Sequence, residues 1–193
     1  MKIDKKLNLV STIEREDGSL VYLHVTPLPY EIVEINCLLL GSLFNRFFSL
    51  VGGIGAPRVA AMMLQSEIND RLALTPELAG KPTLIDDIHR LISVIWSDNG
   101  EWKKTTLDDA LKRDIISLEE LREVEGEIVF FIVGFAIQKS TLVIPTVGKA
   151  LEAYSGQLIS LSTTEYIDSL PKSKTTTNTQ NPQPQSEQSF IPS

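Results

Sequence analysis

The chain has few of the residues that build disulfide frameworks and metal centres. Its 193 residues include one cysteine, Cys37, and two histidines, His24 and His89. A single cysteine forms neither an intramolecular disulfide nor a multi-cysteine zinc site, so the composition favours a reducing compartment. Positive charge is also in deficit, since 18 lysines and arginines stand against 25 acidic residues and give a net charge of −7. Binding along a nucleic-acid backbone gains no support from this balance, and we expect no nucleic-acid partner.

Long uninterrupted hydrophobic runs are also lacking. The first residues become polar before an apolar segment of signal-peptide length is reached, so we expect no secretion signal. The most apolar stretch, 30–51, is interrupted by Asn45 and Arg46 and is followed by glycines, whereas a membrane span needs about 20 uninterrupted apolar residues. We therefore favour a buried or partner-bound helix over a membrane span, and expect no membrane partner.

The C-terminal segment has few apolar residues. Residues 171–193 are rich in Thr, Asn, Gln, Ser and Pro, with Phe190 and Ile191 as the only large apolar groups. Such a segment cannot bury enough surface to offset its chain entropy, so we predict a disordered polar tail. The predicted organisation is an N-terminal β-hairpin (1–28), a helical body that forms one domain with it (29–170), and the tail (171–193).

Two short segments near the N-terminus alternate in the manner of strands. Leu7, Leu9, Ser11 and Ile13 alternate with the residues between them, as do Val21, Leu23 and Val25, which is the period of a half-buried strand. Asp17 and Gly18 lie between them, and Asp-Gly supplies the positive φ of a tight hairpin turn. A two-stranded ribbon is marginal in isolation, so we expect this hairpin to lie on helices or to pair with another chain.

The rest of the body has helical periodicity, and we predict a mainly α fold in which the hairpin is followed by a bundle of about six or seven helices. Ser or Thr followed three residues later by an acidic residue marks helix starts at Thr106, Ser117 and Ser162. Pro145 is expected to prevent one helix from continuing into the next. The helices are predicted over 30–51, 56–74, 83–96, a short segment after Thr106, 118–139, 147–160 and 163–170.

No arrangement of reactive side chains indicates catalysis. His24 is predicted on the polar surface of the hairpin, His89 on an exposed helix face, and Cys37 among apolar residues as a small buried hydrophobe. The acidic pairs Asp86-Asp87 and Asp108-Asp109 fall in predicted first helical turns, where acids complement the helix dipole. We therefore expect no enzyme activity, no catalytic residues, no cofactor and no metal.

Glycines and tryptophans have structural interpretations. The 52–55 segment lacks the lysine of a phosphate-binding loop and is predicted to be a hinge between helices. Gly126 and Gly134 within one helix indicate close approach of a neighbouring helix, because helical glycine is otherwise costly. Trp96 and Trp102 flank a turn, and we favour loop anchoring over ligand stacking.

The predicted 30–51 helix has only a narrow polar stripe and more apolar surface than one small neighbour covers. This surface is a candidate protein-binding site, for a client or for a second copy of the chain. Its candidate residues are Leu39, Leu43, Phe44, Phe47 and Phe48.

The order of these features resembles a known family. The hairpin LNLVSTIEREDGSLVYLHVTPL leads through a proline into YEIVEINCLLLGSLF, and an acidic body and a polar tail follow. This arrangement is similar to the tail assembly chaperones of long-tailed bacteriophages, with the clearest match over about residues 5–50.

The resemblance implies a non-enzymatic role in viral tail assembly in the host cell cytoplasm. Such chaperones bind the helical tape-measure protein and recruit tail tube subunits, and they are absent from the finished particle. Many such systems also make a longer form by ribosomal frameshifting. The alternative from another class is a structural virion protein, either a minor tail component or a head-to-tail connector.

Overall fold

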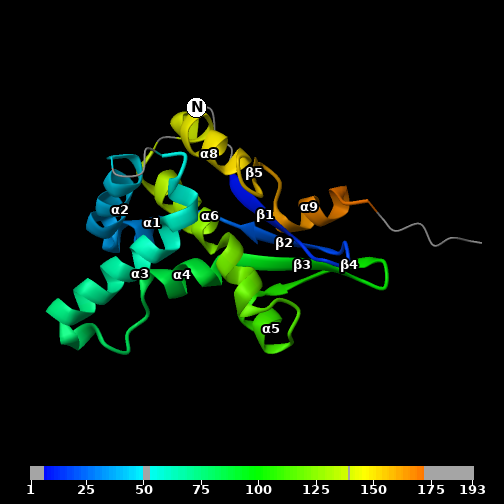
Figure 1. Cartoon of the computed structure of the whole chain (residues 1–193), viewed down its shortest axis with the longest axis horizontal. Helices are drawn as coiled ribbons and strands as arrows, with labels where there is room; N and C mark the ends of the chain where they lie inside the picture. Colours follow the sequence, from blue (N-terminus) through cyan, green and yellow to red (C-terminus); the bar gives the residue numbers. More distant parts are fainter. Residues whose placement is uncertain (1–6, 50–52, 139, 172–193) are drawn as a thin grey trace, which may run out of the picture.

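An antiparallel sheet of five strands lies at the centre of the protein (Figure 1). The computed structural model describes residues 7–49, 53–138 and 140–171, so nearly all of the predicted tail lies outside the described residues. The strand order is β4-β3-β2-β1-β5, and every neighbouring pair is antiparallel. The strands are β1 (Asn8–Glu14), β2 (Leu20–Val25), β3 (Ile92–Asp98), β4 (Glu101–Thr106) and β5 (Gly156–Ile159).

The N-terminal hairpin forms as predicted. Glu14 pairs with Leu20 next to the turn, and Gly18 adopts a φ of +78° that an L-residue rarely takes. The hairpin was expected to lie on helices or to pair with another chain: β1 does pack against helix α6 (Leu118–Ile137), but β2 pairs with β3 and β1 pairs with β5 of this same chain, which the sequence did not predict. The hairpin thereby becomes the middle of the sheet.

The predicted mainly α architecture, a hairpin followed by a helical bundle, is wrong. The segment predicted as one helix over 83–96 ends its helix at Arg90 and continues as β3, and the segment 147–160 ends as β5. Strand β3 carries Ile92, Val94 and Ile95, and its side chains pack well on a pleated surface next to β2. Residues Asn99 and Gly100 both take positive φ in the turn to β4, so the Asp-Asn-Gly sequence makes a hairpin rather than a helix end.

Most of the helices lie on one side of this sheet, and a short C-terminal helix lies on the other (Figure 1). The predicted 30–51 helix is divided at Asn36, while Leu50 and Val51 lie outside the described residues. Contrary to the prediction, the helical path continues through Pro145, which lies in a π-helical turn between two α-helical turns. The helical elements are α1 (Tyr30–Ile35), α2 (Cys37–Ser49), α3 (Ala56–Leu74), η1 (Pro76–Leu78), α4 (Leu84–Arg90), α5 (Leu107–Lys112), α6 (Leu118–Ile137), α7 (Ser140–Val143), the π-helix η2 (Ile144–Gly148), α8 (Lys149–Glu152) and α9 (Thr163–Ser169).

The predicted helix starts are confirmed. Thr106 accepts a hydrogen bond from the Asp109 backbone N–H, and Ser117 and Ser162 each form a capping box with the acidic residue three positions later. These bonds satisfy N–H groups that have no partner within the helix. Local sequence therefore determines where these helices begin.

Helix α6 is the central packing element of the fold. It packs against α2, α3 and β1, and Phe130 and Phe131 are fully buried. A side chain at Gly126 would overlap the backbone carbonyl of Pro57 in α3, and one at Gly134 would overlap Val147. The predicted close approach at both glycines is confirmed.

Helices pack on both faces of the sheet, although β4 has no buried residue. Leu9, Leu23 and Val94 belong to the continuous core that includes α6. On the opposite face the ring of Tyr166, in α9, lies 5.6 Å from that of Tyr22. Within the described residues no helix is both long and apolar enough to cross a membrane.

Candidate functional site

Two segments that carry exposed apolar side chains contribute to the lining of one pocket. Tyr30, Ile35 and Leu38 belong to α1 and α2 and are each at least three-quarters exposed. Leu74 and Leu78 belong to the end of α3 and to η1. Exposed apolar surface of this kind marks interaction sites more often than a scatter of single residues does.

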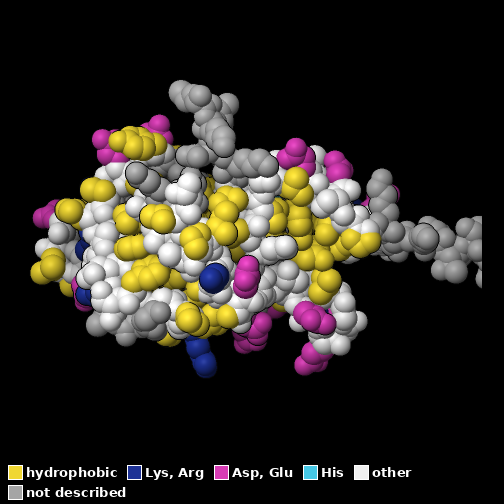
Figure 2. All heavy atoms as spheres, turned by 90° about the horizontal axis from the view of Figure 1, so that it is seen from above, with side chains coloured by type: hydrophobic (Ala, Val, Ile, Leu, Met, Phe, Trp, Pro, Cys, Tyr) yellow, Lys and Arg dark blue, Asp and Glu magenta, His cyan; other side chains and the backbone are white. Residues whose placement is uncertain are grey.

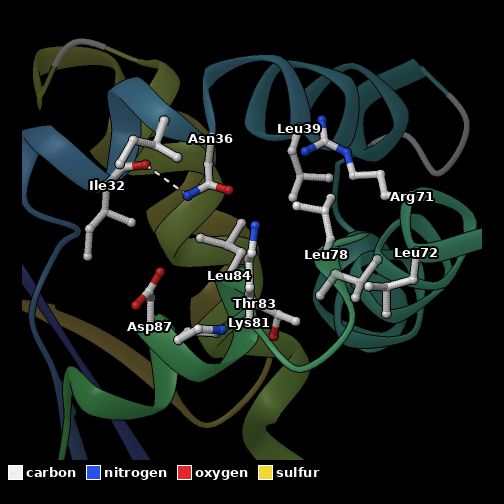
Figure 3. A pocket seen from close by; sticks show the side chains of 13 residues that line it. Ile32, Asn36, Leu39, Arg71, Leu72, Leu78, Lys81, Thr83, Leu84 and Asp87 are labelled. Carbon is white, nitrogen blue, oxygen red and sulfur yellow. Dashed lines mark hydrogen bonds between the residues drawn. The ribbon is translucent and has the colours of Figure 1, made fainter. Parts of the chain in front are cut away.

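A groove lies between these segments (Figure 3). Its volume is about 450 Å³, and its lining comes from α1, α2, α3, η1 and α4. The apolar part of this lining, which we call the apolar groove, consists of Ile32, Ile35, Leu39, Ile68, Leu72, Leu78, Pro82 and Leu84.

Local sequence explains the shape of the groove. At the end of α1, where the chain turns into α2, the Asn36 side-chain amide donates to the Ile32 carbonyl oxygen over 3.0 Å (Figure 3). On the opposite wall, Gly80 takes a φ of +79° and reverses the chain after η1. The Thr83 capping box then starts α4, and its bonds to Asp86 lower the pKa of that carboxyl.

Basic side chains outnumber acidic ones among the residues that line the groove. Arg71, Lys81 and Asp87 are its charged lining residues. Asp87 is paired with Arg90 over 2.9 Å, while no ion pair joins Arg71 or Lys81 to a described carboxylate. Two cations therefore stand at the groove of a protein whose net charge is −7. Figure 2 shows one face of the molecule, on which few Lys and Arg side chains are visible.

The five residues predicted to bind protein are placed differently from one another. Leu39 lines the apolar groove, although it is only 2% exposed. Leu43 and Phe47 are fully buried within this chain and so present no surface to a partner in the described state. Phe44 and Phe48 are half-buried, with ring centroids 4.6 Å apart, and Phe48 stacks on Phe130.

The sequence-based site therefore missed the groove residues Ile35, Leu72 and Leu78. The sequence carried no signal that distinguished Leu78 in η1 as a binding residue. Its place in the groove depends on the proximity of α1, which lies more than 40 positions earlier in the chain.

Two predictions about reactive side chains are wrong. His24 is fully buried rather than on the surface: its Nε2 lies 3.0 Å from the Leu161 carbonyl oxygen and its Nδ1 lies 3.2 Å from the Thr163 hydroxyl. Burial lowers the pKa of His24 below 6.5. Cys37 is exposed rather than buried.

His89 is half-buried and lies 2.9 Å from Glu125, so its predicted exposed face is only partly open. Nowhere in the described part of the chain do three or more His, Cys, Asp or Glu residues form a group able to hold a metal ion.

A buried carboxylate joins three elements. Glu127 in α6 is 4% exposed and accepts hydrogen bonds from the Ser11 hydroxyl over 2.8 Å and the Ser155 hydroxyl over 2.9 Å. These donors occupy both carboxylate oxygens, so Glu127 holds β1 and the turn before β5 against α6. It has a structural role in this arrangement.

A second hollow, of about 870 Å³, runs beside α3 and α6. Its walls carry charged groups at many positions, including Arg58, Arg122 and Glu123, together with the His89–Glu125 pair. An apolar partner would leave such groups desolvated, so this hollow is less suited to apolar docking than the groove.

No protein-family model matches the chain, and comparisons with curated proteins and with solved structures find no similar protein or fold.

Proposed function

We propose that this protein is a phage tail assembly chaperone that holds a helical segment of the tape-measure protein in the apolar groove and recruits tail tube subunits. The observation that supports this proposal is the groove itself, because it combines an apolar floor with exposed apolar residues on its walls. Amphipathic helices dock into such grooves through a few apolar anchors at helical spacing. The role is non-catalytic in this proposal.

The test is co-expression with the tape-measure protein. Ile35 is 82% exposed and Leu78 is 38% exposed, so aspartate at either position should leave the fold intact. Ile35→Asp and Leu78→Asp should each abolish protection of the tape-measure protein from aggregation, because each places a charge at an apolar contact. The matched control is Ile144→Asp, which alters an apolar residue that is 56% exposed and lies outside the groove.

The proposal is wrong if the folded groove variants protect the tape-measure protein as well as the wild type does. It is also wrong if the tape-measure protein stays soluble without any chaperone. The non-catalytic part is tested separately with a Cys37→Ser, His89→Gln double variant, which should protect the client normally.

A structural virion protein remains the second candidate, and the central sheet favours it more than the predicted helical bundle did. Among the described residues β4 pairs only with β3, so its outer edge can accept a strand from a neighbouring subunit. Mass spectrometry of purified particles separates the two roles. Stoichiometric protein in mature virions would support the virion role and exclude the chaperone.

A further inference from the structure

We propose that Arg71 and Lys81 make the apolar groove selective for a helix whose apolar stripe is flanked by acidic side chains. This inference rests on the proposed function, since it specifies the chemistry of the segment that the groove holds. The observation behind it is the charge imbalance at the groove, where the one acidic lining residue, Asp87, already has a partner in Arg90.

The two cations come from different elements. Arg71 lies in the last turn of α3 and is half-buried, whereas Lys81 is exposed in the segment between η1 and α4 (Figure 3). Both line the same groove as Leu72 and Leu78. A helix that places apolar anchors against these leucines therefore carries its flanking side chains close to two positive charges.

The half-burial of Arg71 strengthens its attraction for an acidic side chain of the bound helix. Charges at a partly desolvated site interact more strongly than fully solvated ones, and salt screens them less. A guanidinium also binds a carboxylate with two parallel hydrogen bonds, which favours a particular orientation. A lysine-flanked helix would instead bring like charges together.

The net negative charge of the protein would not by itself favour an acidic partner. A surface with a net charge of −7 repels an acidic partner at long range. Binding of an acidic-flanked helix consequently requires local cations, and the groove supplies them. A basic partner would be attracted over most of the molecule yet repelled at the groove.

The experiment compares two labelled helical peptides by fluorescence anisotropy, using the full chain. The peptides share one leucine stripe at positions i, i+3, i+4 and i+7 and differ only in having Glu or Lys at the flanking positions. At about 0.15 M salt, which screens the long-range repulsion by the net charge, the wild type should bind the Glu-flanked peptide about tenfold more tightly, given two exposed or half-exposed ion pairs.

Charge reversal tests the named residues. An Arg71→Glu, Lys81→Glu variant should lose the preference or invert it. A Lys112→Glu, Lys149→Glu variant has the same net charge, alters exposed lysines outside the groove and should keep the wild-type preference. Circular dichroism confirms that both variants are folded.

The outcomes separate this inference from the function on which it rests. Equal binding of the two peptides by the wild type, or an unchanged preference in the Arg71, Lys81 variant, would overturn the selectivity and leave the chaperone proposal standing. Absence of binding to either peptide would overturn both the selectivity and the placement of the client in this groove.

Discussion

The close approach of α3 and α6 at Gly126 allows one stability effect to be worked out in advance. A Cβ at this position would overlap the Pro57 carbonyl oxygen. Backbone cannot rotate away as a side chain can, so α3 would have to move from α6 along its length. Gly126→Ala should therefore destabilise the protein even though alanine is the better helix former.

The magnitude follows from two opposing terms. Replacing glycine by alanine within a helix gains about 1 kcal/mol of propensity. Overpacking a well-filled core costs about 3 kcal/mol at the upper end of its usual range, which applies because the overlap is with backbone. The net loss in the free energy of unfolding is about 2 kcal/mol.

Gly41 provides the matched control. It lies inside α2, and a Cβ there would meet no heavy atom within 4 Å. Gly41→Ala should therefore raise the free energy of unfolding by about 0.5–1 kcal/mol. Replacing glycine by alanine should thus lower the free energy of unfolding at Gly126 and raise it at Gly41.

Urea denaturation followed by circular dichroism measures both effects. With a slope of about 2 kcal/mol/M, Gly126→Ala should lower the midpoint by about 1 M and leave the slope unchanged. If Gly126→Ala raised the midpoint as Gly41→Ala does, the helices would not be in contact at this glycine and the reasoning would fail.

Three further predictions concern the tail, His24 and Glu127. Deleting residues 172–193 should change the free energy of unfolding by less than about 0.5 kcal/mol in a thermal or urea melt, because this polar segment offers little packing; a larger loss would show that it docks. Burial lowers the pKa of His24 in the folded protein, so the unfolded state binds a proton more readily. The free energy of unfolding should therefore have its full value above pH 6.5 and fall as the pH drops from there towards 5. In a His24→Gln variant the urea midpoint should change less with pH over that range. Glu127→Ala should cost about 3 kcal/mol in a urea melt, because the Ser11 and Ser155 donors lose their acceptor, whereas a loss below about 1 kcal/mol would mean that water replaces the carboxylate.

Several features depend on neighbouring residues alone, and the sequence was sufficient to predict them. The Asp17-Gly18 turn is one example, since positive φ at Gly18 is a local requirement of the hairpin. The helix starts at Ser117 and Ser162 are others, because their capping bonds join residues three positions apart. The glycine in α6 that contacts α3 was also identifiable, because its cost inside a helix needs a compensating contact.

Features that depend on distant residues required the tertiary structure. Ile92 and Val94 are compatible with a helix or a strand, and the hydrogen bonds to β2, which lies about 70 positions earlier, decide for the strand. The same applies to β5, whose partner β1 lies about 150 positions away.

Burial also depends partly on local sequence and partly on distant residues. The sequence showed that Leu43 and Phe47 need apolar cover, but only the packing of α2 on α6 showed that this chain supplies that cover itself. Periodicity predicts that an apolar face will be buried and leaves open which surface buries it. That surface is determined by long-range contacts, whose free energy is gained only when segments distant in the sequence come together. The hairpin and helix starts were therefore determined by the sequence locally, and the five-stranded sheet and the groove by the tertiary structure.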